Sequence, residues 1–464
     1  MSRSESCSGV NDVRTQENRS SINDLPQHLL VKILNRMQDS AAVARCRLVS
    51  KTFNSAAVDV RSIYLTCSLL HFVRSRYQLA RGTSPFKENF RKLIQVCDPS
   101  SIDCIQIGME KPMSEITFDD VDDAESDLYL TDDRFVSEWI PLVCNQLKTL
   151  SISDFWVQAC WKRSSVLGVI STYCKSLVDL QLKNSWLPVR DLDYMPTLTR
   201  LTLEFIRLED ENLTRLNSCF PNLQVLNLIV VGGLKEPYIR LQNLRTCHWI
   251  ASNAPLSLTI CSPSLQNLEL SCVRPRYLTL ETPQLSHLCL AIKKPDIVHV
   301  REVSALSSLS ISSSDLSSLL SSFPLATNIL KLTVDSQQCP EPIKSTRITM
   351  EDLIDYFPNL RSLTLKSNVW TEMEKSFDSD DARNQRCLES LKELNLDMFG
   401  HDLDISLDFI FYLLSKCPNL LDVKFFFPGD FSFKNPDLIS FCSVKYPLIR
   451  WSCGTCNKRT TFMS

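Results

Sequence analysis

The sequence has 464 residues, of which 44% are hydrophobic and 22% are charged, and its formal net charge at pH 7 is -3. These values are typical of folded globular proteins, and the small negative charge argues against binding to nucleic acid or to an anionic membrane. The chain has no long apolar run and none of the motifs GxGxxG, GxxxxGK[ST], GxSxG and HExxH. We therefore expect no membrane span, no catalytic residue, no cofactor and no metal ion.

Residues 1–20 are polar and rich in serine, which predicts a disordered tail and not a signal peptide. Without a secretory signal, the 19 cysteines indicate thiols in a reducing compartment and not a disulfide framework. We therefore expect the protein in the cytoplasm, the nucleus or both.

Residues 21–65 have the pattern of three short helices. Four apolar residues have the spacing of one helix face: Leu30, Ile33, Leu34 and Met37. Ser40 can cap a second short helix, and residues 46–58 suit a third. Residues 21–54 carry five Lys or Arg against two Asp, so an acidic partner would be attracted to this unit.

This stretch resembles an F-box, the motif through which substrate receptors of ubiquitin ligases hold a Skp1-type adaptor. The matching residues assigned to adaptor binding are Leu25, Pro26, Leu29, Leu30, Ile33, Leu34, Val49, Lys51 and Phe53. The chain departs from many F-boxes at Gln27-His28, where acidic residues are frequent, and at Phe53, where Trp is frequent. The resemblance implies a Skp1-like adaptor as a partner and, through it, a cullin scaffold.

Residues 66–145 match no pattern closely, and we assign them to a connecting region and an N-terminal cap. They contain an acidic insertion, residues 115–133, with nine carboxylates and no Lys or Arg. A solvated loop explains this composition better than a docking site for a basic substrate. Its spacing does not match a calcium-binding loop.

Residues 146–464 repeat the pattern Leu-x-x-Leu-x-Leu, twice within a nearly identical phrase, FPNLQVLNL at 220–228 and FPNLRSLTL at 357–365. The spacing between copies, 20 to 31 residues, resembles that of leucine-rich repeats. The middle apolar positions are Leu150, Leu180, Leu201, Leu226, Cys247, Leu268, Leu288, Leu309, Leu332, Leu363, Leu394 and Val423. Because alternate residues of a strand face the same side, stacked parallel copies bury these side chains in one column.

These patterns predict an α/β fold, in which a three-helix F-box precedes an irregular leucine-rich repeat solenoid. We expect a parallel sheet on the concave face and helices or 3₁₀ turns on the convex face. Helical stripes begin at Val166, Met350 and Leu407 in the long repeats at the two ends, whereas the repeats of about 21 residues between them have room only for turns or 3₁₀ segments.

Two further motifs carry weaker signals. The Asn that leucine-rich repeats usually place eight residues after the first Leu is found only at Asn368, so we expect no asparagine ladder. The one CxxC motif, Cys453 to Cys456, has no second Cys pair and no nearby His to complete a zinc site. We interpret it as part of a frayed terminus after the last repeat.

Residues that alternate with the buried leucines would line the concave face, which solenoids commonly use for binding. This face has little charge in the middle of the array. We expect a protein substrate to contact Val225, Ile229, His248, Ile250 and Cys289 there, with His248 supplying a directional hydrogen bond. The alternative is that the chain's own tail or a return loop covers this patch.

An F-box followed by leucine-rich repeats is the arrangement of a large family, and these irregular, glycine-poor repeats resemble its plant members. The resemblance implies a non-catalytic substrate receptor of an SCF-type ubiquitin ligase, with an unidentified protein substrate. One alternative is a co-receptor that depends on a small molecule, and a polyanion beneath that ligand would need clustered Arg and Lys from adjacent strands. Another is a scaffold that acts without the ligase and does not need the F-box.

Overall fold

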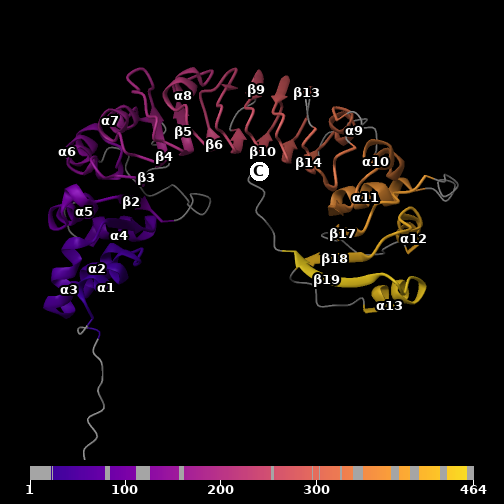
Figure 1. Ribbon diagram of the computed structural model, residues 1–464, viewed down its shortest axis with the longest axis horizontal. Coiled ribbons are helices and arrows are strands. Elements are labelled where there is room, and N and C mark those ends of the chain that lie inside the picture. The colour runs from indigo at the N-terminus through magenta and orange to yellow at the C-terminus, as the bar shows by residue number, and fades with distance from the viewer. Residues whose placement is uncertain are drawn as a thin grey trace, which may run out of the picture.

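The described part of the chain forms an arch in the computed structural model, with one sheet along the inner side (Figure 1). The structure describes residues 22, 25–78, 84–110, 126–155, 161–251, 255–294, 296–301, 304–323, 327–337, 348–377, 386–397, 407–428 and 436–456. The predicted tail, residues 1–20, lies outside them. Within them, one sheet has 15 strands and another has four.

The 15-stranded sheet is parallel and forms the concave side of the arch. Its strands, in their order across the sheet, are β1 (Ser62–Cys67), β2 (Cys104–Met109), β3 (Thr149–Ser153), β4 (Asp179–Leu187), β5 (Arg200–Leu208), β6 (Val225–Val231), β8 (Thr246–Ala251), β10 (Asn267–Cys272), β12 (His287–Ile292), β14 (Ser308–Ser313), β15 (Lys331–Ser336), β16 (Ser362–Leu365), β17 (Glu393–Asp397), β18 (Asp422–Pro428) and β19 (Arg450–Cys456). The sheet begins before residue 146, where we expected the repeats to start. Ile102, Ile105 and Ile107 supply the apolar spacing of an earlier copy, and all three are buried.

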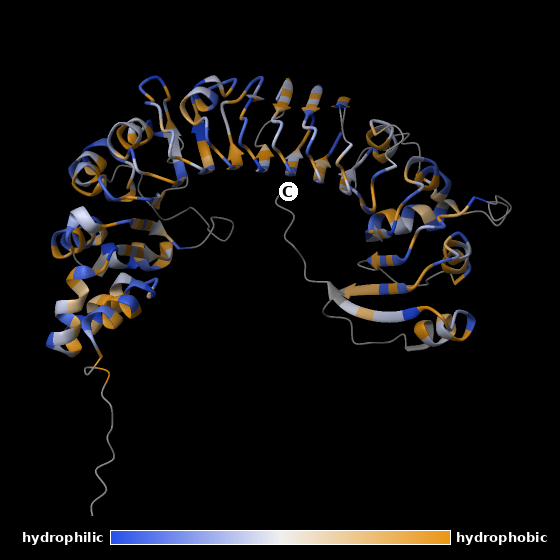
Figure 2. Ribbon diagram, viewed as in Figure 1, coloured by the Kyte–Doolittle hydropathy of each residue, from blue (hydrophilic) through white to orange (hydrophobic). Residues whose placement is uncertain are grey.

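The predicted repeat register is confirmed. Leu226 of β6 pairs with Leu201 of β5 on one side and with Cys247 of β8 on the other. From Leu150 to Val423, every middle apolar side chain is at most 2% exposed, so the leucines form one continuous column inside the arch. Figure 2 shows the corresponding alternation of apolar and polar residues along the strands.

Helices cover the convex side at both ends of the array, as predicted. Those before the middle of the array are α4 (Leu69–Gln78), α5 (Phe86–Val96), α6 (Asp133–Val143), α7 (Val166–Tyr173) and α8 (Thr214–Cys219), and those after it are α9 (Leu316–Leu320), α10 (Met350–Tyr356), α11 (Ser367–Ser376), α12 (Leu407–Ser415) and α13 (Pro436–Lys445). The three predicted helical stripes lie on α7, α10 and α12. Their apolar faces, for example Val166 and Ile170, are buried in the common core.

The middle of the convex side differs from the prediction. The return legs there are not turns or 3₁₀ segments but short parallel strands, which form the second sheet in the order β13-β11-β9-β7. Their bounds are β7 (Tyr238–Ile239), β9 (Ser257–Cys261), β11 (Tyr277–Glu281) and β13 (Ile297–Arg301). The reason is a second alternating pattern, Leu258/Ile260 and Leu278/Leu280, whose side chains are fully buried.

Asparagines join neighbouring repeats at the turns before four of the strands, β6, β15, β16 and β18. The Nδ2 atoms of four asparagines donate to backbone carbonyls of the preceding repeat at 2.8 to 3.0 Å: Asn222 to Pro196, Asn328 to Ser304, Asn359 to Thr327 and Asn419 to Glu389. These residues lie one position before the first Leu of the pattern. The usual ladder position lies eight residues after that Leu, so the expectation of no ladder did not cover this row of asparagines. The phrase FPNL therefore combines a buried Phe, a turn, a bonding Asn and a buried Leu.

The end of the acidic insertion is folded into the core. Residues 115–125 lie outside the described residues, but residues 126–133 are not the solvated loop that we expected. Asp127 is buried and pairs with Arg76 at 3.3 Å, and Leu128 and Leu130 are fully buried. The leucines between the acidic residues explain this burial, because they extend the apolar core under the first repeats.

Asp154, just after β3, connects this folded segment to the sheet through hydrogen bonds. Its carboxylate is fully buried and accepts hydrogen bonds from the backbone N–H groups of Leu130 and Thr131 and from the Thr131 hydroxyl. Burial raises the pKa of the Asp154 carboxyl to about 7, although these donors and Lys87 act in the opposite direction.

This raised pKa predicts a dependence of stability on pH. Because the folded pKa of Asp154 lies above the unfolded value, the stability it contributes is complete below about pH 4 and is lost as the pH rises through about 7. Relative to Asp154→Asn, we expect the free energy of unfolding of the wild type to fall by about 1.4 kcal/mol per pH unit in this window. Urea unfolding at several pH values measures it, and parallel profiles for the two proteins would contradict it.

The C-terminal prediction also needs correction. β19 pairs with β18 from Arg450 to Cys456, so the CxxC motif lies on the last strand of the sheet and not in a frayed terminus. The alternation of Trp451 and Cys453, which pair with the buried Val423 and Phe425, continues the repeat register.

Candidate functional site

Three short helices form the N-terminal end of the arch: α1 (Gln27–Asn35), α2 (Ser40–Val49) and α3 (Lys51–Ala56). The cap of α2 is Asp39 and not Ser40, which we expected, because the Asp39 carboxylate accepts from the N–H of Ala41 at 2.8 Å. Ser50 caps α3 by accepting from the N–H of Phe53 at 3.2 Å. Ser50 has an extended backbone, so the chain turns sharply between α2 and α3. The unit has its own small core, separate from that of the repeats.

The structure divides the predicted adaptor-binding residues into three groups. Leu30, Leu34 and Phe53 are buried in the core of the three-helix unit. Leu25 and Leu29 are half-buried. Pro26, Ile33, Val49 and Lys51 are exposed and are therefore available to a partner.

Sequence reasoning missed the most exposed apolar residue of this unit. The side chain of Leu48 is 88% exposed, and that of its neighbour Val49 is 74% exposed. Both lie at the end of α2, next to the turn at Ser50. The signal in the sequence is a pair of apolar residues between Arg47 and Ser50 that continues no stripe on α2.

The three-helix unit is joined to the repeat sheet by direct hydrogen bonds. The N–H of Tyr64 in β1 donates to the buried hydroxyl of Ser40 at 2.9 Å, and the N–H of Arg61 donates to Asn35 Oδ1 at 2.9 Å. These contacts fix the orientation of the unit relative to the first strand of the sheet.

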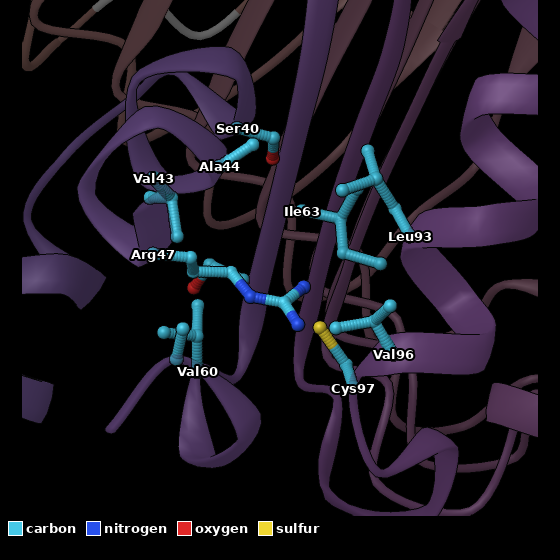
Figure 3. Close-up of a pocket in the computed structure, with 11 residues that line it drawn as sticks. Ser40, Val43, Ala44, Arg47, Val60, Ile63, Leu93, Val96 and Cys97 are labelled. Carbon is cyan, nitrogen blue, oxygen red and sulfur yellow. The ribbon is translucent and has the colours of Figure 1, made fainter. Parts of the chain in front are cut away.

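A small cavity of about 20 Å³ lies at this junction, lined by residues of α2, β1 and α5. Figure 3 shows the guanidinium group of Arg47 extending across it toward Cys97. Burial raises the pKa of the Cys97 thiol, and the positive charge of Arg47 opposes this effect. The cavity has room for about one water molecule and is far smaller than a typical ligand pocket.

The predicted substrate-binding residues come together on the concave face. Ile229 of β6 pairs in register with Ile250 of β8, and His248 of β8 pairs with Glu269 of β10. Cys289 of β12 continues the row beyond Glu269. Val225, Ile229, His248, Ile250 and Cys289 are all half-buried. Ile229, His248 and Ile250 therefore lie close together on neighbouring strands. Cys289 lies two strands beyond His248, and Val225 lies four residues before Ile229, beside Thr246.

The rival expectation, a cover formed by the chain itself, finds no support among the described residues. The described return legs lie on the convex side of the arch (Figure 1). The tail, residues 457–464, lies outside the described residues.

Four ion pairs between adjacent strands lie at the two ends of the concave face. The ion pairs are Asp179 with Arg200 at 3.3 Å, Lys183 with Glu204 at 2.6 Å, Lys366 with Asp397 at 2.9 Å and Asp422 with Arg450 at 2.9 Å. Each of these Lys and Arg residues thus faces a carboxylate, which opposes the capture of a polyanion by these strands.

His248 lies beside an acidic residue of the next strand, Glu269. Its Nε2 atom lies 3.8 Å from Glu269 Oε1, which is too far for a hydrogen bond. The side chain is 30% exposed, so its ring remains available to donate to or accept from a bound partner.

The described ranges contain neither a metal-binding cluster nor a membrane-spanning helix. No group of three or more His, Cys, Asp or Glu residues is placed to hold a metal ion in this part of the chain. None of the described helices combines the length and the apolar character that crossing a bilayer requires.

Comparisons with known proteins agree with this architecture. Residues 22–68 match the family model described as F-box-like. An F-box/LRR-repeat protein of Arabidopsis thaliana is 40% identical to this chain over 442 residues, which cover 93% of this chain and 98% of the relative. The similarity therefore extends through the three-helix unit and the repeats together.

Proposed function

Because the chain belongs to the plant F-box/leucine-rich repeat proteins, we propose that it is the substrate-recognition subunit of an SCF-type ubiquitin ligase. The three-helix unit binds a Skp1-like adaptor and, through it, a cullin scaffold. The concave face of the repeats binds a protein substrate. The chain itself performs no chemistry, and it acts in the cytoplasm, the nucleus or both.

One observation carries this proposal: two accessible apolar surfaces lie on separate parts of a continuous structure. The adaptor surface consists of Pro26, Ile33, Leu48 and Val49, at the N-terminal end of the arch. The substrate surface lies on β6, β8 and β12. Hydrogen bonds between the three-helix unit and the first strand join them, so both partners can be bound at once.

This arrangement serves ubiquitin transfer by holding the substrate near the charged conjugating enzyme. Confining two reactants to one complex raises their effective concentration and removes much of the entropy cost of their encounter. The direct hydrogen bonds between the F-box unit and β1 support this role, because they limit movement of the repeats relative to the adaptor.

The substrate surface is tested by the double variant Ile229→Asp/Ile250→Asp. Two carboxylates in the apolar centre should oppose burial of an apolar partner, so we expect at least a tenfold loss of the proteins that co-precipitate with the repeats. Skp1 and cullin should remain bound. The measurement is quantitative mass spectrometry of immunoprecipitates from plant cells in which the proteasome is inhibited.

The matched control is Tyr277→Asp/Ile297→Asp, which places the same charges on an adjacent exposed pair of the convex sheet. It should leave the captured proteins unchanged. Retention of these proteins by the concave variant, with the adaptor still bound, would place substrate recognition elsewhere. Substrate binding by a protein that holds no adaptor would favour the ligase-independent scaffold instead.

A further inference from the structure

A single acidic side chain occupies the centre of the concave face. The structure describes all the residues that alternate with the buried ones on β6, β8, β10, β12 and β14. Among these described residues, Glu269 is the only one that carries a formal charge at neutral pH. Its neighbours in register on the adjacent strands are His248 and Cys289. Ile229 and Ile250 lie on the two preceding strands of the sheet, β6 and β8.

Glu269 also differs from three acidic residues nearer the ends of the array. Asp179, Glu204 and Asp397 each face a Lys or Arg on an adjacent strand. Glu269 is 61% exposed, and its ionic neighbour in the described structure is His248, which pairs with it electrostatically only when protonated. The centre of the face therefore carries a negative potential that a basic group of a partner would neutralise.

The spacing between the acidic and apolar groups defines the partner further. Ile250 pairs in register with Ser271, so it lies one strand away from Glu269 and two residues further along. With strands about 4.8 Å apart and a rise of about 3.3 Å per residue, the two positions are about 8 Å apart. In an extended peptide, side chains two residues apart point to the same face and are separated by about 7 Å.

We propose that the substrate presents an extended segment in which a Lys or Arg lies two residues from a large aliphatic side chain. The aliphatic side chain packs against Ile229 and Ile250, and the basic group pairs with Glu269. This inference rests on the proposed function and specifies the substrate class of the same surface. An exposed ion pair changes affinity by only roughly two- to fivefold, so the apolar contact supplies most of the affinity and Glu269 supplies selectivity.

The test uses random dodecapeptides displayed on phage and selected on the immobilised complex of the chain with its adaptor. The wild type should enrich peptides with an aliphatic residue and a Lys or Arg two positions apart. Glu269→Lys should replace the basic preference by Asp or Glu. By fluorescence anisotropy, synthetic peptides of opposite charge should reverse their order of affinity between the two proteins. The control Glu393→Lys makes the same charge change on an exposed residue of β17 and should leave the preference unchanged.

Each other outcome contradicts the inference, and each shows which part of it is wrong. If Ile229→Asp/Ile250→Asp removes the aliphatic preference but Glu269→Lys leaves the charge preference unchanged, the pairing with Glu269 is wrong and the substrate surface stands. If the isoleucine variant selects the same peptides as the wild type, the substrate surface itself is wrong. Failure of the wild type to enrich any peptide family rules out an extended segment as the recognised form.

Discussion

Replacing Leu48 and Val49 together by Asp is expected to abolish co-purification of a Skp1-type adaptor. Both side chains are exposed, at 88% and 74%, so they contribute little to the core of the three-helix unit and are free to anchor a partner. The few residues that are fully desolvated at the centre of an interface carry most of its binding energy, and the largest losses on truncation are about 2 kcal/mol or more. Two buried carboxylates would cost more, because each would lose its hydration.

The control for this variant is Val444→Asp/Leu448→Asp. These side chains are 84% and 91% exposed and lie at the C-terminal end of the arch, far from α2 (Figure 1). The control should retain the adaptor, and both variants should keep the thermal unfolding midpoint of the wild type. Pull-down of purified adaptor measures the effect, and undiminished binding by the Leu48/Val49 variant would remove this surface from the adaptor interface.

The second large effect is expected in the leucine column. Leu226→Ala and Leu363→Ala should each lower the free energy of unfolding by about 2 to 5 kcal/mol, because both side chains are fully buried and their removal leaves a cavity. Leu421→Ala is the control, since Leu421 is 49% exposed and its truncation should cost well under about 1 kcal/mol. Urea unfolding followed by circular dichroism measures the three changes.

The strands that lose protection in Leu226→Ala show whether the repeats stabilise one another by stacking or whether the substitution destabilises its own repeat alone. In a solenoid each repeat is stabilised mainly by its neighbours, so Leu226→Ala should also increase amide hydrogen exchange in β5 and β8. Unchanged exchange in these two strands would contradict the continuous column at this repeat.

The repeat register was predictable because it depends on a short spacing that is repeated many times. Three apolar positions within six residues specify a strand with one buried face, and even Cys247 and Trp249 keep that register in the degenerate copy. The helices on α7, α10 and α12 were predictable for the same reason, since each shows a stripe with helical spacing.

The return strands were not predicted, because length alone does not decide between a turn and a strand. The alternation of Leu258 with Ile260 was the available signal, but a run of five residues beside a stronger leucine pattern is easily overlooked. The asparagine row was missed because only the position of the usual ladder was considered. Asn222 and Asn359 were visible in the repeated phrase itself.

The adaptor surface could be predicted from the sequence only in part. A family motif marks which residues resemble those of an F-box, but the rotation of each helix in the packed unit decides which of them are exposed. Leu34 turns into the small core, whereas Ile33 next to it is exposed. Leu48 lies outside the matched positions, and packing alone leaves it at the surface. On the repeats, strand alternation fixes this choice in advance, so the concave positions could be named from the sequence.

The most direct test of the proposed function is whether the 464-residue chain forms a stable complex with a Skp1-type adaptor and the N-terminal domain of a cullin. The three purified components are mixed and analysed by size-exclusion chromatography with multi-angle light scattering. The account predicts one peak with the mass of a 1:1:1 complex, and loss of the adaptor and cullin from that peak for Leu48→Asp/Val49→Asp. Separate elution of a folded wild-type chain and the adaptor would contradict it.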